Sequence, residues 1–135
     1  MAFGGGQIDQ TALAEDELIQ AEATLLESVR LDPGNVESLY ALALLHQRTG
    51  AYARAAAELK QAIEKCPEDA RLHYYLGVAY NSQDAVDQAI LALETAARLR
   101  PDDPRIHRLL GVAFDKKELP ARAREAYRRA AALNG

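Results

Sequence analysis

Residues 36–69 read VESLYALALLHQRTGAYARAAAELKQAIEKCPED, and the same pattern recurs over residues 70–103 and again over 104–135. Positions that lie 34 residues apart carry the same kind of side chain. The matching columns hold Leu42, Leu76 and Leu110; Ala55, Ala89 and Ala123; Leu59, Leu93 and Tyr127; Ala62, Ala96 and Ala130; and Pro33, Pro67 and Pro101. A fixed period of this length predicts a solenoid, in which each unit packs against its neighbours.

Each unit predicts two antiparallel helices. In the second copy, apolar residues at helical spacing run over 72–80, a polar break covers 81–84, and the helical spacing resumes over 89–97. The sequence therefore predicts an all-α fold. Gly77 and Gly111 fall in the middle of predicted helices, where glycine costs about 1 kcal/mol against alanine. We expect these two glycines to allow a close crossing of helices.

These columns resemble the signature of the tetratricopeptide repeat family. The residues that carry the resemblance are Leu39, Leu42, Ala43, Ala55, Leu59, Ala62 and Pro67, then Leu76, Gly77, Tyr80, Ala89, Leu93, Ala96 and Pro101, and finally Leu110, Gly111, Phe114, Ala123, Tyr127 and Ala130. The departures are His46, His73 and His107, where the family usually has a large apolar or aromatic residue, and Gly135, where a proline would end the unit. The resemblance implies a right-handed α-solenoid of antiparallel helix pairs with about seven helices.

The period divides the chain into three repeats and a shorter first part. We expect a disordered tail over residues 1–8, a half repeat with one capping helix over 9–35, and tetratricopeptide repeats over 36–69, 70–103 and 104–135. The last repeat ends without a further polar helix. Either its outward arginines keep this face soluble, or the chain is part of a longer one.

The composition and motifs argue against several classes of protein. The chain has no secretory signal and no run of 18 apolar residues, so we expect a cytoplasmic protein with no membrane partner. No catalytic constellation or phosphate-binding loop stands out, and we expect no enzyme and no cofactor. His46, His73 and His107 are interpreted as packing residues and not as metal ligands, and Cys66 as a plain residue before Pro67 at the end of a repeat, without a nucleophilic role.

Charge is distributed unevenly along the chain. Residues 1–37 have eight acidic side chains against Arg30, a net charge of −7, whereas residues 98–135 have ten basic side chains against five acidic ones, a net charge of +5. In a linear stack this pattern gives an acidic end and a basic end. Solvated faces explain it, and so does a weak homo-oligomer whose copies associate head to tail. The sequence pI near 5.4 and the lack of aromatic residues interleaved with arginine argue against a nucleic-acid partner.

The first helix of each unit has one stripe of residues that points away from the leucine and glycine columns. The resemblance implies that this stripe lines a concave groove, in which the family binds an extended or helical peptide. We therefore expect a peptide or protein partner, with tyrosine and aliphatic side chains contacting its apolar groups and arginines pairing with its acidic groups. The predicted groove residues are Tyr40, Leu44, Gln47, Arg71, Tyr74, Val78, Asn81, Arg105, Arg108 and Val112.

Some members of the family hold the C-terminal carboxylate of chaperones with lysine and asparagine in the first groove helix and with basic residues in the third. Tyr40, Leu44 and Leu109 stand at such positions here, and only Arg105 fits. The sequence therefore favours another peptide or protein, bound by a scaffold or adaptor.

Overall fold

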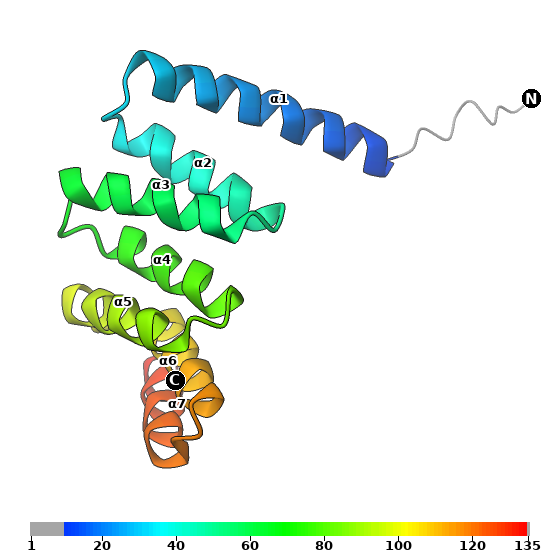
Figure 1. The fold of residues 1–135 in the computed structure, drawn as a ribbon. Coiled ribbons are helices and arrows are strands. Elements are labelled where there is room, and N and C mark those ends of the chain that lie inside the picture. Colours follow the sequence, from blue (N-terminus) through cyan, green and yellow to red (C-terminus); the bar gives the residue numbers. More distant parts are fainter. Residues whose placement is uncertain (1–9, 135) are drawn as a thin grey trace, which may run out of the picture.

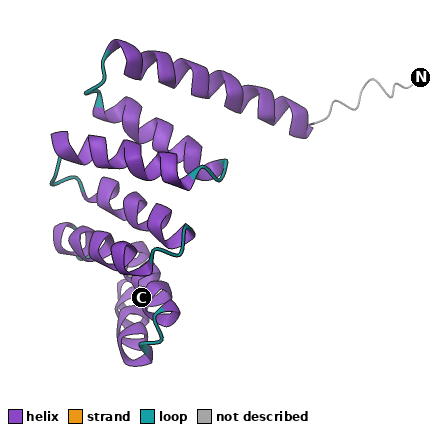
Figure 2. Ribbon diagram, viewed as in Figure 1, coloured by secondary structure: helices purple, strands orange, loops and turns teal. Residues whose placement is uncertain are grey.

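The computed structural model describes residues 10–134, which form a stack of seven α-helices joined by short loops (Figures 1 and 2). The described residues contain no strand, and the prediction of an all-α solenoid of helix pairs is confirmed. The predicted tail over residues 1–8 lies outside the described part. None of the described helices is long and apolar enough to cross a membrane. The helices are α1 (Gln10–Leu31), α2 (Val36–Arg48), α3 (Tyr52–Lys65), α4 (Ala70–Ser82), α5 (Val86–Leu99), α6 (Pro104–Lys116) and α7 (Pro120–Asn134).

The 34-residue period sets where the helices begin. Helices α2, α4 and α6 begin at residues 36, 70 and 104, and each is preceded by a side chain that caps it. The side-chain oxygen of Asn35 accepts a hydrogen bond from the backbone N–H of Ser38 at 3.1 Å, and Asp103 accepts one from Arg105 at 3.0 Å. Asp69 caps α4 in the same way. Such caps satisfy backbone donors that the first turn of a helix leaves unpaired.

The turn inside each helix pair also repeats. One residue in it takes a left-handed backbone conformation: Gly50 with φ of 86°, Asp84 with 58° and Glu118 with 61°. Only the first of these is glycine, the residue that adopts positive φ without steric cost. The repeat therefore imposes the same turn on three different residues, and at Glu118 it does so against the preference of the side chain.

The glycines do mark close crossings. A Cβ atom built on Gly77 in α4 would lie 2.6 Å from Cγ of Leu93 in α5, and one built on Gly111 in α6 would lie 2.5 Å from the ring of Tyr127 in α7. The core otherwise consists mainly of leucine and alanine, with Ile90, Ile106 and Phe114 in its second half, and it divides into two clusters along the stack. Helix packing is thus closest at the columns that define the repeat.

Helix α1 differs from the other helices in length and burial. It spans 22 residues where α3 and α5 span 14, and its N-terminal part extends past the stack (Figure 1). None of its residues from Ala14 onward is fully buried. Val29 is half-buried against the core beside α2, and the hydroxyls of Ser28 and Ser38 share a hydrogen bond of 2.6 Å. That α1 represents half a repeat is still an interpretation of the sequence.

Candidate functional site

The ten predicted groove residues, which we call the stripe, lie on α2, α4 and α6. These three helices are neighbours, because α4 contacts both α2 and α6. The stripe residues on α2 and α4 are half-buried, as is Val112 on α6, whereas Arg105 and Arg108 are exposed. The stripe is therefore a continuous surface of partly covered side chains that ends in two exposed arginines.

Arg71 connects the first two helices of the stripe. Its guanidinium carbon lies 4.3 Å from the centre of the Tyr40 ring, and its Nε donates to Asp69 at 2.8 Å. It also forms an ion pair with Glu37 on α2, and the hydrogen bonds to the two carboxylates hold the pKa of Arg71 above its usual range. Arg71 is thus neutralised locally, and a ligand carboxylate would have to compete with two that are already bound.

Arg105 repeats this arrangement one unit later. Its guanidinium lies 5.1 Å from the ring centre of Tyr74 and donates to the carboxylate of Asp103 at 2.9 Å. The hydrogen bond from Arg105 lowers the pKa of Asp103. Arg108 is different, because it forms no ion pair with any residue in the described range. Of the three predicted arginines, it is the one that could pair with a ligand without first breaking an ion pair within the protein.

Tyr75 belongs to the same surface, although it is not among the residues that the helical spacing predicts. Its ring meets those of Tyr40 and Tyr74 edge to face, with centres 5.8 and 4.9 Å apart. Its backbone carbonyl accepts a hydrogen bond from Nε2 of Gln47 at 2.6 Å. Burial raises the pKa of the Tyr40 and Tyr74 hydroxyls, so both rings are uncharged at neutral pH. The column of Tyr75 holds Ala41 and Leu109 in the other units, which is a weak signal of a contact between neighbouring first helices.

The polar end of the stripe bridges α4 and α6. Nζ of Lys116 donates to the backbone carbonyl of Asn81 at 3.0 Å and to the carboxylate of Asp84 at 3.1 Å. The side-chain oxygen of Asn81 is buried and has no hydrogen-bond partner among the described residues. An amide in this state can accept a hydrogen bond from a ligand or a water.

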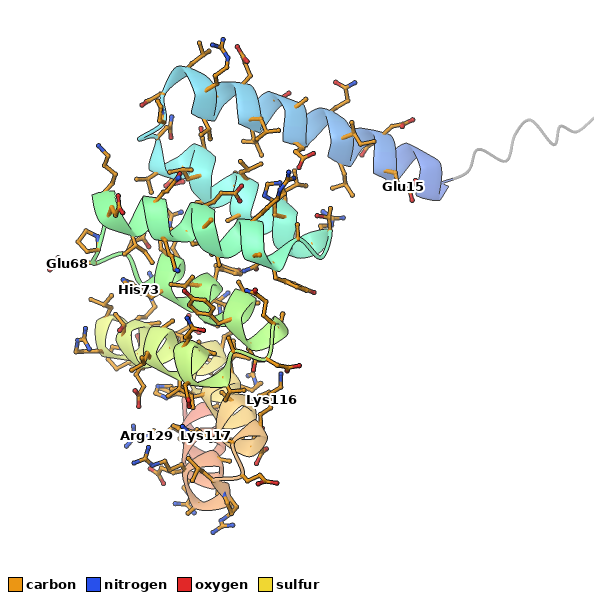
Figure 3. The ribbon with its side chains drawn as sticks, in the orientation of Figure 1. Glu15, Glu68, His73, Lys116, Lys117 and Arg129 are labelled. Atoms are coloured by element: carbon orange, nitrogen blue, oxygen red, sulfur yellow. The ribbon has the colours of Figure 1, made fainter. Side chains whose placement is uncertain are left out.

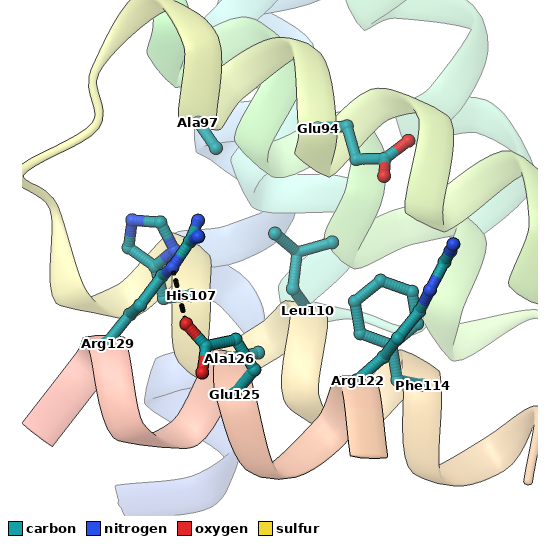
Figure 4. Close-up of a pocket in the computed structure, with 9 residues that line it drawn as sticks. All are labelled: Glu94, Ala97, His107, Leu110, Phe114, Arg122, Glu125, Ala126 and Arg129. Carbon is teal, nitrogen blue, oxygen red and sulfur yellow. Dashed lines mark hydrogen bonds and ion pairs between the residues drawn. The ribbon is translucent and has the colours of Figure 1, made fainter. Parts of the chain in front are cut away.

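A cavity of about 320 Å³ lies away from the stripe, between α5, α6 and α7 (Figure 4). Leu110 and Phe114 contribute apolar groups to its wall, and Arg129 donates to Glu125 across its edge at 3.2 Å. Volume alone would favour this cavity over the stripe. We prefer the stripe, because its aromatic rings and arginines recur in register from one unit to the next.

The two ends of the stack differ in charge, as the sequence predicted. Glu15 projects from α1, while Lys116, Lys117 and Arg129 lie at the other end (Figure 3). Part of the positive charge is paired, since Lys117 forms an ion pair with Asp87, and Arg128 and Arg129 both pair with Glu125. The exposed Arg122 and Arg124 form no ion pair among residues 14–134.

Comparisons with known proteins agree with this architecture. A family profile described as tetratricopeptide repeat matches residues 10–69, 40–104 and 86–135. Among solved structures, one titled "Crystal structure of MamA" has a TM-score of 0.83 at 26% identity, over 93% of this chain and 73% of that one. MamA residues 41 to the end from Desulfovibrio magneticus RS-1 gives a TM-score of 0.84 at 25% identity, over 92% and 71% of the two chains. A search of curated proteins finds no match.

The profile matches overlap and together span the described residues. They identify the repeated helix pair as a module that is generally non-catalytic and mediates contacts between proteins. The chain belongs to the tetratricopeptide repeat family.

Proposed function

We propose that this protein is a non-catalytic scaffold or adaptor that binds a peptide segment of a partner protein along the stripe. The observation that carries the proposal is the aromatic cluster of Tyr40, Tyr74 and Tyr75, which is half-buried and bounded by an exposed Arg108. Tyrosine and arginine are among the few residue types that contribute most of the binding free energy at protein interfaces. The cytoplasmic location stays a prediction from the sequence.

Different side chains of the stripe would contact different groups of the ligand. Apolar side chains of the ligand would contact the tyrosines together with Leu44, Val78 and Val112, while Gln47 and Asn81 offer amides to its backbone. Arg71 and Arg105 lie over tyrosine rings and are held by carboxylates, so they act mainly as rigid parts of the surface. Arg108 would pair with an acidic group of the ligand. An apolar peptide segment with one acidic residue near Arg108 fits this arrangement.

A peptide library displayed on phage would provide the ligand, whose affinity is then measured for matched variants. We expect Tyr74→Ala and Arg108→Ala each to weaken binding by about tenfold or more, as central aromatic and arginine residues do. Arg124→Ala, which removes an exposed arginine on α7 away from the stripe, serves as the control and should bind normally. If Tyr74→Ala and Arg108→Ala fold correctly and bind as tightly as the control, the stripe is not the binding site.

A second candidate function is assembly of copies head to tail. The observation that favours it is on α1, where Ile19 and Leu26 are 63% and 48% exposed on an acidic helix, opposite the basic end of the stack. We expect light scattering at low salt to show a mass that rises with concentration, and 0.5 M salt, where the Debye length is only about 4 Å, to restore the monomer. A monomer under every condition would exclude this assembly and leave peptide binding as the function.

A further inference from the structure

A polar cluster joins the first three helices at a position that is otherwise apolar in this fold. His46 on α2 is 2% exposed, and its ring lies between Glu22 on α1 and Glu58 on α3. Nε2 of His46 is 2.7 Å from Oε2 of Glu22, and Nδ1 is 2.8 Å from Oε1 of Glu58. A buried ring with a carboxylate at each nitrogen is a costly arrangement, because all three groups lose solvation.

The repeat shows what normally occupies these positions. Counting by 34 residues, the three positions hold Ala56, Tyr80 and Ala92 in the next unit, and Ile90, Phe114 and Ala126 in the one after. Both of these sets are mainly hydrocarbon and pack in the core. The fold therefore does not require charge at this place. The chain has three polar side chains together at the one interface that attaches α1 to the stack.

The cluster needs two protons on the imidazole ring. A carboxylate only accepts hydrogen bonds, and a neutral histidine donates from one nitrogen while the other carries a lone pair. Only the imidazolium can donate to both Glu22 and Glu58. The other histidines make no such demand, because Nε2 of His73 and of His107 each lies 2.8 Å from a backbone carbonyl, which one proton satisfies.

Helix α1 is held weakly enough for one contact to matter. Its described side chains include none that is fully buried. Besides half-buried apolar groups, it has the Ser28 to Ser38 hydrogen bond and the contacts of Glu22 with His46 and, at 3.7 Å, with Arg54. Helices α4 and α6, by comparison, each contribute at least five buried residues. Elements that move are drawn from such weakly packed segments.

We propose that Glu22, His46 and Glu58 form a pH-sensitive latch that holds α1 on the stack while the imidazole carries both protons and releases it when one proton is lost. Histidine is the side chain whose charge ordinarily changes between about pH 5 and 8. The deprotonated nitrogen then faces a carboxylate oxygen, so two acceptors repel each other. Glu22 is 33% exposed and Glu58 15%, so Glu22 turns to water more easily and α1 moves away with it.

The charged groups near the ring are two carboxylates and one arginine. Arg54 on α3 lies 3.7 Å from Glu22 and partly offsets the two carboxylates, and no charged group of α4 forms an ion pair with the ring within the described chain. Burial raises the pKa of Glu58, against the lowering effect of its hydrogen bond with His46. As a carboxylate, Glu58 accepts a hydrogen bond from the ring, so the response of the latch to pH rests on the protons of the imidazole.

Hydrogen exchange of the backbone amides of α1 in the full chain tests the latch. After correction for the intrinsic exchange rate, we expect α1 to lose protection by about ten- to a hundredfold between pH 6 and 8.5, as loss of one hydrogen bond to a charged group predicts. Helices α4 to α7 should keep their protection. Equal protection of α1 at both pH values would overturn the proposal.

Two variants separate the latch from general stability. Glu22→Gln places an amide at the ring nitrogen, which can accept from N–H or donate to the lone pair, so α1 should stay docked at both pH values. The combined change Glu22→Ile, His46→Phe and Glu58→Ala copies the apolar set of α5, α6 and α7 and should also remove the pH response. His73→Leu removes a histidine elsewhere, restores the residue type of Leu39 in its column, and should leave the response intact. A response that persists in Glu22→Gln, or disappears in His73→Leu, would overturn the proposal.

Discussion

Replacing Gly77 with alanine is expected to destabilise this protein, although alanine is the better helix former. The new Cβ atom would lie 2.6 Å from Cγ and 2.7 Å from Cδ2 of Leu93. Carbon atoms pack at about 3.5–4.0 Å, so the two side chains cannot coexist without movement. Leu93 is fully buried in the second core cluster and has no open space to enter. The helix pair itself must therefore move apart.

Two opposing effects set the size of the change. Alanine in place of glycine within a helix favours folding by about 1 kcal/mol. An extra methyl group forced into a packed core costs about 1–3 kcal/mol. The net loss in the free energy of unfolding is therefore about 1 kcal/mol, and the larger part of it depends on the contact with Leu93.

Urea unfolding followed by circular dichroism measures this difference, and a double-mutant cycle identifies its cause. Leu93→Ala alone should cost about 2–5 kcal/mol, but the loss should be about 1–3 kcal/mol smaller in the Gly77→Ala background, where the added methyl fills part of the space. Ala43 stands in the same column beside Leu59, so Ala43→Gly should cost about 1 kcal/mol as a control. If Gly77→Ala stabilises the protein by its full helix propensity, or the two changes are additive, the reasoning about the close crossing is wrong.

Further predictions concern the turns and caps. Glu118→Gly should raise the free energy of unfolding by about 1 kcal/mol, because it relieves a left-handed conformation that Gly50 adopts without cost in the first unit; thermal unfolding would check this, and unchanged stability would show that the turn is unstrained. Asp103→Ala should cost about 1 kcal/mol by removing the cap of α6, whereas Asp103→Asn keeps the cap and should cost less. Because Arg105 lowers the pKa of Asp103, the carboxylate stabilises the fold above the ordinary aspartate range and loses this effect as the pH falls through the lowered pKa. The difference in stability between wild type and Asp103→Asn should therefore vanish in acid, and a constant difference would count against the ion pair.

The periodicity of the sequence predicted most of the fold, because each helix pair is specified locally. The polar break over 81–84 falls at the end of α4 and in the turn that follows, and the unit-ending prolines fall in the loops before α2, α4 and α6. The mid-helix glycines were correctly interpreted as close crossings. The positive φ at Asp84 and Glu118 was not predicted, because neither residue type signals it and only alignment with Gly50 does.

The candidate site was predictable only in part. Spacing shows which residues share a helix face, and the stripe residues do lie on three neighbouring helices. Spacing does not show which side chains meet across helices. The sequence therefore did not predict the pairing of Arg71 with Glu37 or the position of Tyr75 between two tyrosines. The cluster around His46 left a readable signal, since Glu22, His46 and Glu58 are three polar residues in columns that are apolar or aromatic in the other units.

Contacts along this stack are short-range in the chain: every helix contacts only those one or two places before or after it. No part of the core depends on bringing distant segments together, so the entropy lost in closing long loops is small and folding is expected to be fast. Because helices contact only near neighbours, the number of repeats can also change during evolution. A 34-residue unit can be duplicated or lost at a turn, and the packing of the remaining units stays as it was.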